Sequence, residues 1–251
     1  MKITTNLNGG VMTVTLADPD NRNALSGALL SELLAAIDAA EADHAVRVVV
    51  VTNEGHIFSA GADLNESAAG ESYTARMAEV FTRVVNSPKP FVGRIAGHAV
   101  AGGVGRACAM DISIAIEDAK FGFTEVRVGV APAIISTICL PKMTRADAAA
   151  AFLRGNRFLA PEAARLGLIN EAVSSVDLND RVDAVVADLL LGAPEALAAT
   201  KSLLTRVPAM HFDEAMDWAS ELSERLFGAD EAKEGMTAYL EKRRPNWVPD
   251  G

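Results

Sequence analysis

One carboxylate lies in an apolar stretch where it could perform acid–base chemistry. The segment Phe121–Pro132 places Glu125 among aromatic and aliphatic residues, with Arg127 as a nearby cation. Burial raises the pKa of such a carboxylate toward the range of a useful general acid or base. An ordinary glutamate paired with Arg127 fits the same residues, so the segment alone leaves both interpretations open.

Two turns of small residues could hold a negatively charged oxygen. The first is Phe58–Leu64 and the second is Gly97–Gly105, and each follows an apolar stretch. Small residues let a ligand approach the backbone, and free N–H groups at the start of a helix favour negative charge. Either turn alone is also typical of an ordinary strand end. The second turn matches neither the dinucleotide fingerprint nor the Walker phosphate loop.

The surrounding elements indicate an α/β core that would position these segments. Val11–Leu16 alternates apolar and polar residues like a half-buried strand, and Val46–Thr52 is almost wholly apolar, like a strand covered on both faces. Ser26 is placed to cap a helix whose leucines recur at helical spacing. Further strands are predicted at Pro90–Ala96 and Ile112–Ala115, and further helices at Ala75–Val85 and Gly102–Met110.

From about Arg145 onward the pattern predicts helices and no further strands. These helices carry more apolar side chains than an isolated tail could cover, so we expect them to dock on the core or on another subunit. Their predicted ranges are Asn179–Leu191, Glu195–Leu204, Phe212–Leu226 and Glu231–Lys242.

The composition excludes several classes of protein. The chain has 251 residues, 50% of them hydrophobic and 22% charged, which predicts one main globular core. The formal net charge of −10 disfavours a nucleic-acid partner, and no apolar stretch approaches the roughly 20 residues that cross a bilayer. Cys108 and Cys139 lack metal-ligand spacing and are interpreted as packing residues. We therefore expect a cytoplasmic protein with no metal site and no membrane partner.

In this order and spacing, the segments resemble the crotonase superfamily over nearly the whole chain. Pro19–Leu25 looks like the family's Pro-x-x-x-Asn-Ala-Leu turn, which binds coenzyme A (CoA), and Ala60–Asp63 and Ala101–Gly103 resemble two further family turns. The other family-like segments are Gly155–Arg157, Ala163–Leu168, Glu234–Met236 and Leu240–Arg243.

The resemblance implies the crotonase fold, an α/β right-handed spiral of strand–strand–helix turns followed by a helical C-terminal region. We expect a core domain at residues 1–195 and a C-terminal helical region at 196–251 that joins subunits into a trimer or a dimer of trimers. The implied substrate is an acyl-CoA thioester. Because CoA is part of that substrate, no separate cofactor is expected.

The resemblance also assigns roles to residues. The backbone N–H groups of Ala62 and Gly102 would form an oxyanion hole for the thioester carbonyl, and Glu125 would transfer protons. Asp63 is expected to order the Ala62 turn through local hydrogen bonds. His98 is expected to be a satisfied core histidine, with contact to the acyl pocket as the alternative. The residues expected to bind substrate or CoA are Arg22, Ala24, Leu25, Ala60, Asp63, Leu64, Gly103 and Gly105.

Position 105 departs from the family's hydratases, which carry a first glutamate there and a second one at the position of Glu125. Two-carboxylate hydration uses both side chains to position and activate one water. The leading prediction is an enoyl-CoA hydratase, which adds water across a 2-enoyl-CoA double bond. The alternatives are a Δ3,Δ2-enoyl-CoA isomerase that uses Glu125 alone, and a catalytically weakened acyl-CoA-binding oligomer. A protease and a dehydrogenase are disfavoured because their motifs are missing.

Gly105 also needs a physical reason, since glycine inside a helix costs about 1 kcal/mol relative to alanine. One explanation is a packing gain against a neighbouring element. The other is spare volume in the pocket wall that admits a branched acyl group or a water molecule.

Overall fold

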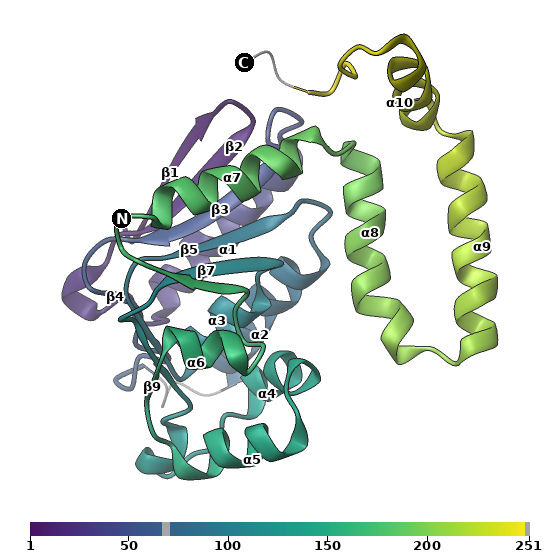
Figure 1. Cartoon of the computed structure of the whole chain (residues 1–251). Helices are drawn as coiled ribbons and strands as arrows, with labels where there is room; N and C mark the ends of the chain where they lie inside the picture. Colours follow the sequence, from purple (N-terminus) through teal and green to yellow (C-terminus); the bar gives the residue numbers. More distant parts are fainter. Residues whose placement is uncertain (67–70, 249–251) are drawn as a thin grey trace.

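The computed structural model describes residues 1–66 and 71–248, and within them the strands form two sheets (Figure 1). In the larger sheet β1 is antiparallel to β2 and every other pair is parallel; in the smaller sheet only β8 and β9 are antiparallel. The larger sheet has the order β1 (Ile3–Asn8), β2 (Val11–Leu16), β3 (Val48–Asn53), β5 (Phe91–Ile95), β7 (Ile112–Ile116) and β10 (Glu171–Val173). The smaller sheet has the order β4 (Ile57–Ser59), β6 (His98–Val100), β8 (Lys120–Gly122) and β9 (Phe158–Leu159).

The chain alternates between the two sheets and then enters a helix. β3 and β4 precede α2 (Glu71–Asn86), β5 and β6 precede α3 (Gly102–Ala109), and β7 and β8 precede α4 (Ala133–Cys139). This repeated strand–strand–helix order is the one that the family resemblance implied. Its consequence is that each turn of the chain contributes one short strand to the smaller sheet.

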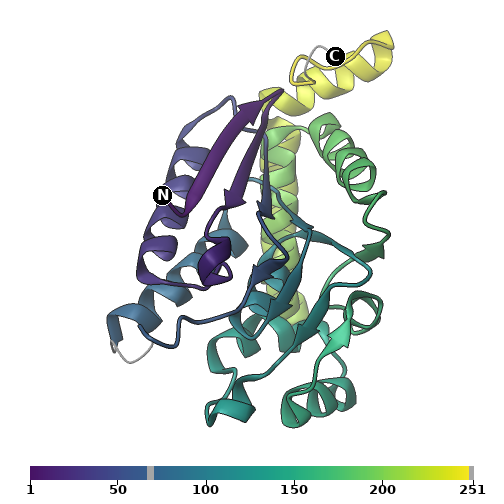
Figure 2. The same ribbon diagram turned by 90° about the vertical axis from the view of Figure 1, so that its left-hand side faces the viewer.

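The strand β3 is buried along its whole length because helices cover both faces of the larger sheet (Figure 2). Val49 and Val51 belong to the main core, together with Leu29, Leu33 and Ile37 of α1 (Gly27–Ala42). Val48 and Val50 belong to a second cluster, together with Leu178, Val182 and Val186 of α7 (Leu178–Leu191). The period of two that separates these valines is that of a strand, and the predicted burial on both faces is confirmed.

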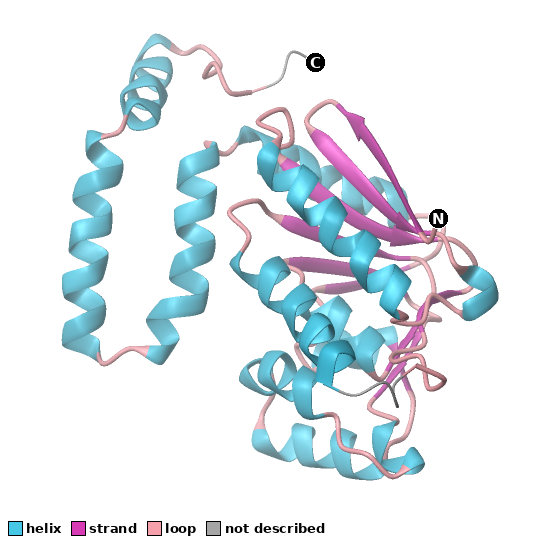
Figure 3. Cartoon of the chain, turned by 180° about the vertical axis from the view of Figure 1, so that it is seen from behind, coloured by secondary structure: helices cyan, strands magenta, loops and turns pink. Residues whose placement is uncertain are grey.

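The C-terminal part of the chain is mainly helical, as predicted. α8 (Pro194–Arg206) lies beside the core. α9 (Phe212–Gly228) packs on the side of α8 that faces away from the core and leads to α10 (Asp230–Glu241) (Figures 1 and 3). Residues 249–251 of the predicted region 196–251 lie outside the described residues. In the part of the chain that is described, no helix combines the length and the apolar character needed to cross a membrane.

The prediction of helices alone after Arg145 is wrong. α5 (Arg145–Arg154) and α6 (Ala160–Arg165) are helical, but β9 lies between them and β10 follows them. These strands have two and three residues, too few for an alternating pattern to be recognised.

One buried lysine fastens α8 to the core. The ammonium of Lys201 lies 2.8 Å from a carboxylate oxygen of Asp111 and donates hydrogen bonds to the carbonyl oxygens of Val84 and Lys89. Lys201 is only 6% exposed, so these three oxygens replace the water that it loses on folding.

Candidate active site

Three loops meet at one edge of the smaller sheet. β4, β6 and β8 are parallel, with Ser59 beside Ala99 and Val100 beside Gly122. Because parallel strands end at the same edge, the chain leaves all three strands on one side. The segments that begin there carry Ala62, Gly102 and Glu125. The fold therefore brings together the three residues to which the sequence assigned chemistry.

The amides of Ala62 and Gly102 flank one small space. A Cβ built on Gly102 would lie 3.7 Å from the amide nitrogen of Ala62, so the two positions face each other. Among the described residues neither N–H donates a backbone hydrogen bond outside regular elements, and Gly102 is the first residue of α3, where no carbonyl of the helix can accept from it. Both N–H groups are thus available to a ligand oxygen.

Backbone strain marks the turn that leads into Gly102. Ala101 has a φ of 50° and a ψ of −125°, a conformation that L residues rarely adopt and that costs about 1–3 kcal/mol. Gly61 has a φ of 87°, and a Cβ on it would lie 2.8 Å from the Cβ of Ala101. Glycine at 61 therefore permits the close approach of the two turns.

The predicted CoA-binding turn, Pro19–Leu25, is joined to the Ala62 turn by hydrogen bonds. The N–H of Leu25 donates to the carbonyl oxygen of Gly61 at 2.8 Å, and the N–H of Ala60 donates to the carbonyl oxygen of Arg22 at 3.1 Å. Ala24, next to Leu25, is buried. The two turns consequently form one unit.

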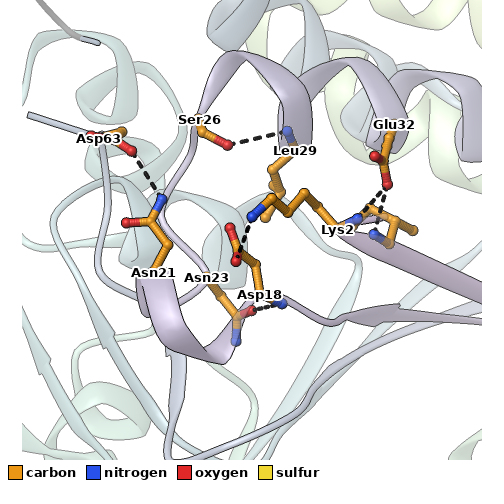
Figure 4. Close-up of polar contacts among 9 residues, drawn as sticks. Lys2, Asp18, Asn21, Asn23, Ser26, Leu29, Glu32 and Asp63 are labelled. Carbon is orange, nitrogen blue, oxygen red and sulfur yellow. Dashed lines mark hydrogen bonds and ion pairs between the residues drawn. The ribbon is translucent and has the colours of Figure 1, made fainter. Parts of the chain in front are cut away.

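Asparagine side chains fix this unit internally (Figure 4). The fully buried Asn23 accepts from the N–H of Asp18 at 2.9 Å, and its amide group donates to the carbonyl oxygens of Glu54 and Ile57. Asn21 donates to the carboxylate of Asp63 at 2.9 Å. Asp63 also accepts from the N–H of Asn65, and these hydrogen bonds hold its pKa below the usual value. Asp63 thus makes the local hydrogen bonds expected of it.

Tyr73, from α2, spans both turns. Its hydroxyl donates to the carbonyl oxygen of Leu25 at 2.6 Å and accepts from the N–H of Asp63 at 3.1 Å. Tyr73 is buried and lines the same pocket as Ala62. It therefore fixes the position of the predicted oxyanion-hole turn relative to the rest of the site, a role that the sequence did not indicate.

Glu125 is half-buried at the start of a short 3-10 helix, Glu125–Val128. Its Oε2 atom is buried, and no described residue forms a hydrogen bond with it. Burial raises the pKa of this carboxyl above its usual value because the charged form loses water. The alternative pairing with Arg127 is wrong, because Oε2 of Glu125 has no partner among the described residues and the guanidinium of Arg127 donates instead to the carbonyl oxygen of Arg154 at 3.5 Å. A carboxylate in this state is suited to accept and return a proton.

The pocket that joins these groups has a volume of about 280 Å³. It contains Ala62, Gly102 and Glu125, and apart from them its wall is mainly apolar. The remaining lining residues are Tyr73, Thr74, Met77, Ala101, Val130, Ala131, Pro132, Ala133, Ile134 and Ile135. A second hollow, of about 360 Å³, lies among α8, α9 and α10 and contains none of the predicted site residues.

The space beside Gly105 is filled. A Cβ built on Gly105 would lie 2.2 Å from Cγ2 of Ile135 and 3.5 Å from the ring of Phe81. Ile135, from α4, is 3% exposed and lines the pocket. The expectation of spare volume at Gly105 is therefore wrong, and the packing explanation is correct, because glycine lets α3 and α4 approach until Ile135 occupies that place.

The other predicted residues are not among those that line the pocket. Gly103 faces away from it, since a Cβ there would lie 2.4 Å from the carbonyl oxygen of Ser59. Leu64 is exposed on the Ala62 turn. His98 is not among the pocket residues; its Nδ1 atom accepts a hydrogen bond from the N–H of Lys120 at 3.1 Å, as expected for a satisfied histidine.

Cys108 and Cys139 are buried, in agreement with a packing role. In the described part of the chain, no group of three or more His, Cys, Asp or Glu side chains is arranged to hold a metal ion.

Comparison with known proteins identifies the family. The model of the enoyl-CoA hydratase/isomerase family matches residues 6–249. The chain belongs to this family. A Thermus thermophilus protein with a provisional enoyl-CoA hydratase name is 36% identical, over 95% of this chain and 98% of its own length. The short-chain-enoyl-CoA hydratase of Clostridium acetobutylicum is 30% identical, over 94% and 93% of the two chains.

Solved structures of this enoyl-CoA hydratase/isomerase family share the fold. The enoyl-CoA hydratase of Mycobacterium smegmatis superposes with a TM-score of 0.93 at 30% identity, covering 98% of this chain and 99% of its own. The predicted crotonase fold is therefore confirmed, and the family implies an acyl-CoA substrate.

Proposed function

We propose that this chain transfers a proton on an enoyl-CoA thioester, with the N–H groups of Ala62 and Gly102 holding the thioester oxygen and Glu125 carrying the proton. The observation that carries the proposal is the position of these three groups around one apolar pocket. When a proton leaves C2, negative charge develops on the thioester oxygen. Each preorganised N–H donor is worth roughly 2.7–4 kcal/mol in such a transition state.

The reaction that the geometry supports best is the conversion of a 3-enoyl-CoA into the 2-enoyl isomer. Glu125 takes a proton from C2, and the electron pair moves into the carbonyl to give a dienolate. The same carboxyl then returns the proton at C4, so the double bond moves from C3–C4 to C2–C3. One carboxylate is sufficient for both steps. Glu125 is the only carboxylate among the described pocket residues.

Ile135 supports isomerisation over two-carboxylate hydration. The family's hydratases carry their first glutamate at the position of Gly105, and here Ile135 packs on that glycine. An apolar side chain cannot orient a water molecule by hydrogen bonding. The wall that would hold the attacking water in a two-glutamate site is therefore apolar in this chain.

Hydration of a 2-enoyl-CoA is the second candidate, and the names of the relatives favour it. In this reaction Glu125 alone would orient the water, accept its proton as oxygen attacks C3, and supply a proton to C2. The binding of CoA by Arg22, Ala24, Leu25, Ala60, Asp63 and Leu64 belongs to both candidates, and neither uses a metal or a redox cofactor.

The two candidates differ in the sign of one absorbance change. The purified protein is offered a 2-enoyl-CoA and, separately, a 3-enoyl-CoA, and the absorbance of the conjugated thioester is followed. A gain from the 3-enoyl-CoA indicates isomerisation, and a loss from the 2-enoyl-CoA indicates hydration. No change with either substrate, together with retained CoA binding, contradicts the proposal and supports an acyl-CoA-binding oligomer.

We also propose that the C-terminal helices join subunits into a trimer or a dimer of trimers. Several large apolar side chains of α8–α10 are exposed in the single chain, more than a soluble surface usually carries in one region. They are Leu204, Phe212, Met216, Phe227, Met236, Tyr239 and Leu240. Sedimentation velocity tests this assembly: a monomer at micromolar concentration would contradict it.

A further inference from the structure

The guanidinium of Arg106 is buried, and no described residue forms a hydrogen bond with it. Arg106 lies on α3 and is 2% exposed, and none of its three side-chain nitrogens forms a hydrogen bond with a described residue. Its guanidinium carbon lies 5.9 Å from the ring centre of Phe58, at the outer limit of a cation–π contact. Burial lowers its pKa to about 9, which leaves the group charged at neutral pH. Unpaired buried charge strongly destabilises a folded protein.

Arg106 shares the helix α3 with Gly102, whose N–H belongs to the proposed oxyanion hole. Arg106 follows Gly102 by four residues, and residues with this spacing lie on the same face of a helix. Long helical side chains lean toward the N-terminus of their helix, which for Arg106 is the end formed by Gly102. The Gly102 position on this face packs against the side chain of Leu25 and lies near the amide of Ala62.

Tyr73 joins both turns of the site and lines the pocket. Burial raises the pKa of the Tyr73 hydroxyl, and the charge of Arg106 opposes that rise. The hydroxyl is hydrogen-bonded to Leu25 and Asp63. Asp63, the acidic group of the Ala62 turn, is hydrogen-bonded to Asn21 and Asn65 and forms no hydrogen bond with Arg106. Among the described residues, the positive charge of Arg106 therefore has no hydrogen-bonding partner.

We infer that Arg106 is a positioning residue whose buried charge, acting through Tyr73, favours negative charge on the thioester oxygen held by Ala62 and Gly102. This inference rests on the proposed function. A charge fixed in the interior costs no reorganisation when the enolate forms, which is the condition under which electrostatic stabilisation is effective. The unpaired charge of Arg106 lowers the stability of the fold but serves the site, as in other stability–activity trade-offs.

The test uses bound but-2-enoyl-CoA in a Glu125→Gln background, where the ligand is held without turnover. Polarisation of the carbonyl by an oxyanion hole shifts the absorbance of the bound thioester to longer wavelength. Arg106→Met, which keeps the apolar stem but removes the charge, should reduce this shift, and Arg106→Lys should largely restore it. In the chain that retains Glu125, Arg106→Met should lower kcat roughly tenfold with little change in KM.

The same Arg106→Met variant should unfold at a higher urea concentration than the parent, because it removes an unpaired buried charge. Arg106→Leu is the second neutral variant. An unchanged shift and unchanged kcat in either neutral variant overturns the inference, and so does loss of folding in both, since the charge would then be structural. Absence of any shift in the Glu125→Gln parent instead contradicts the proposed oxyanion hole itself.

Discussion

A side chain introduced at Gly105 should collide with Ile135 and destabilise the contact between α3 and α4. The Cβ of Gly105→Ala would lie 2.2 Å from Cγ2 of Ile135, far inside van der Waals contact. Overpacking of this kind costs typically 1–3 kcal/mol, against about 1 kcal/mol gained from the helix propensity of alanine. Gly105→Glu adds more bulk and a desolvated carboxylate, so it should be the less stable of the two variants.

Removing the opposing side chain should reverse part of this loss. Ile135→Ala alone leaves a cavity and should cost about 2–5 kcal/mol, because Ile135 is almost fully buried. In the double variant Gly105→Glu/Ile135→Ala the new side chain enters the vacated space. The free energy of unfolding should therefore exceed the additive expectation by about 1 kcal/mol or more.

Urea unfolding of the natural chain, Gly105→Glu, Ile135→Ala and the double variant measures this coupling. The rate of hydration of a 2-enoyl-CoA measures its chemical consequence. The double variant places a second carboxylate where the family's hydratases have one, so its hydration rate should rise above that of the natural chain. Additive stabilities, or a Gly105→Glu variant as stable as the natural chain, would refute the account of Ile135 as the residue that fills this place.

Three further predictions concern charge and capping. Because burial raises the pKa of Glu125, the reaction rate should fall as the pH drops through an apparent pKa above 4.5, which a pH–rate profile measures. For the same reason Glu125→Gln should stabilise the fold at neutral pH but not below pH about 4, which urea unfolding at the two pH values measures. Lys201→Met leaves Asp111 without its cation and should lower the free energy of unfolding by roughly 3–5 kcal/mol. Lys233→Met, on the surface, should change that free energy little. Equal losses in the two variants would contradict the role of Lys201 in holding α8 on the core. Ser26→Ala removes the cap of α1 and should cost about 1 kcal/mol by urea unfolding.

Local patterns predicted the elements that are long or carry a specific signal. Ser26 accepts a hydrogen bond from the N–H of Leu29, as a capping serine should, and Val48–Asn53 is the fully buried strand that its valines predicted. The strands of the smaller sheet were not predicted, because segments of two or three residues are too short for an alternating pattern. Their pairing is a tertiary property.

The family resemblance located the groups to which chemistry was assigned, but it did not reveal their surroundings. Tyr73 and Ile135 reach the site from α2 and α4, and each matters through a contact that sequence spacing does not encode. Ile135 gave no signal, since an isoleucine in an apolar segment is typical of any core. The glycine at position 105 was the visible half of that contact, and only the packing of α4 on α3 decided between spare volume and a filled space.

The most direct test of the account compares the natural chain with Glu125→Gln on a 3-enoyl-CoA. The formation of the conjugated thioester is followed by absorbance, and binding of the CoA ester is measured by calorimetry. We expect Glu125→Gln to lose rate by roughly 10²- to 10⁴-fold, with binding retained within a few fold. A Glu125→Gln variant that binds the thioester and isomerises it at nearly the natural rate would contradict the assignment of Glu125 as the proton carrier.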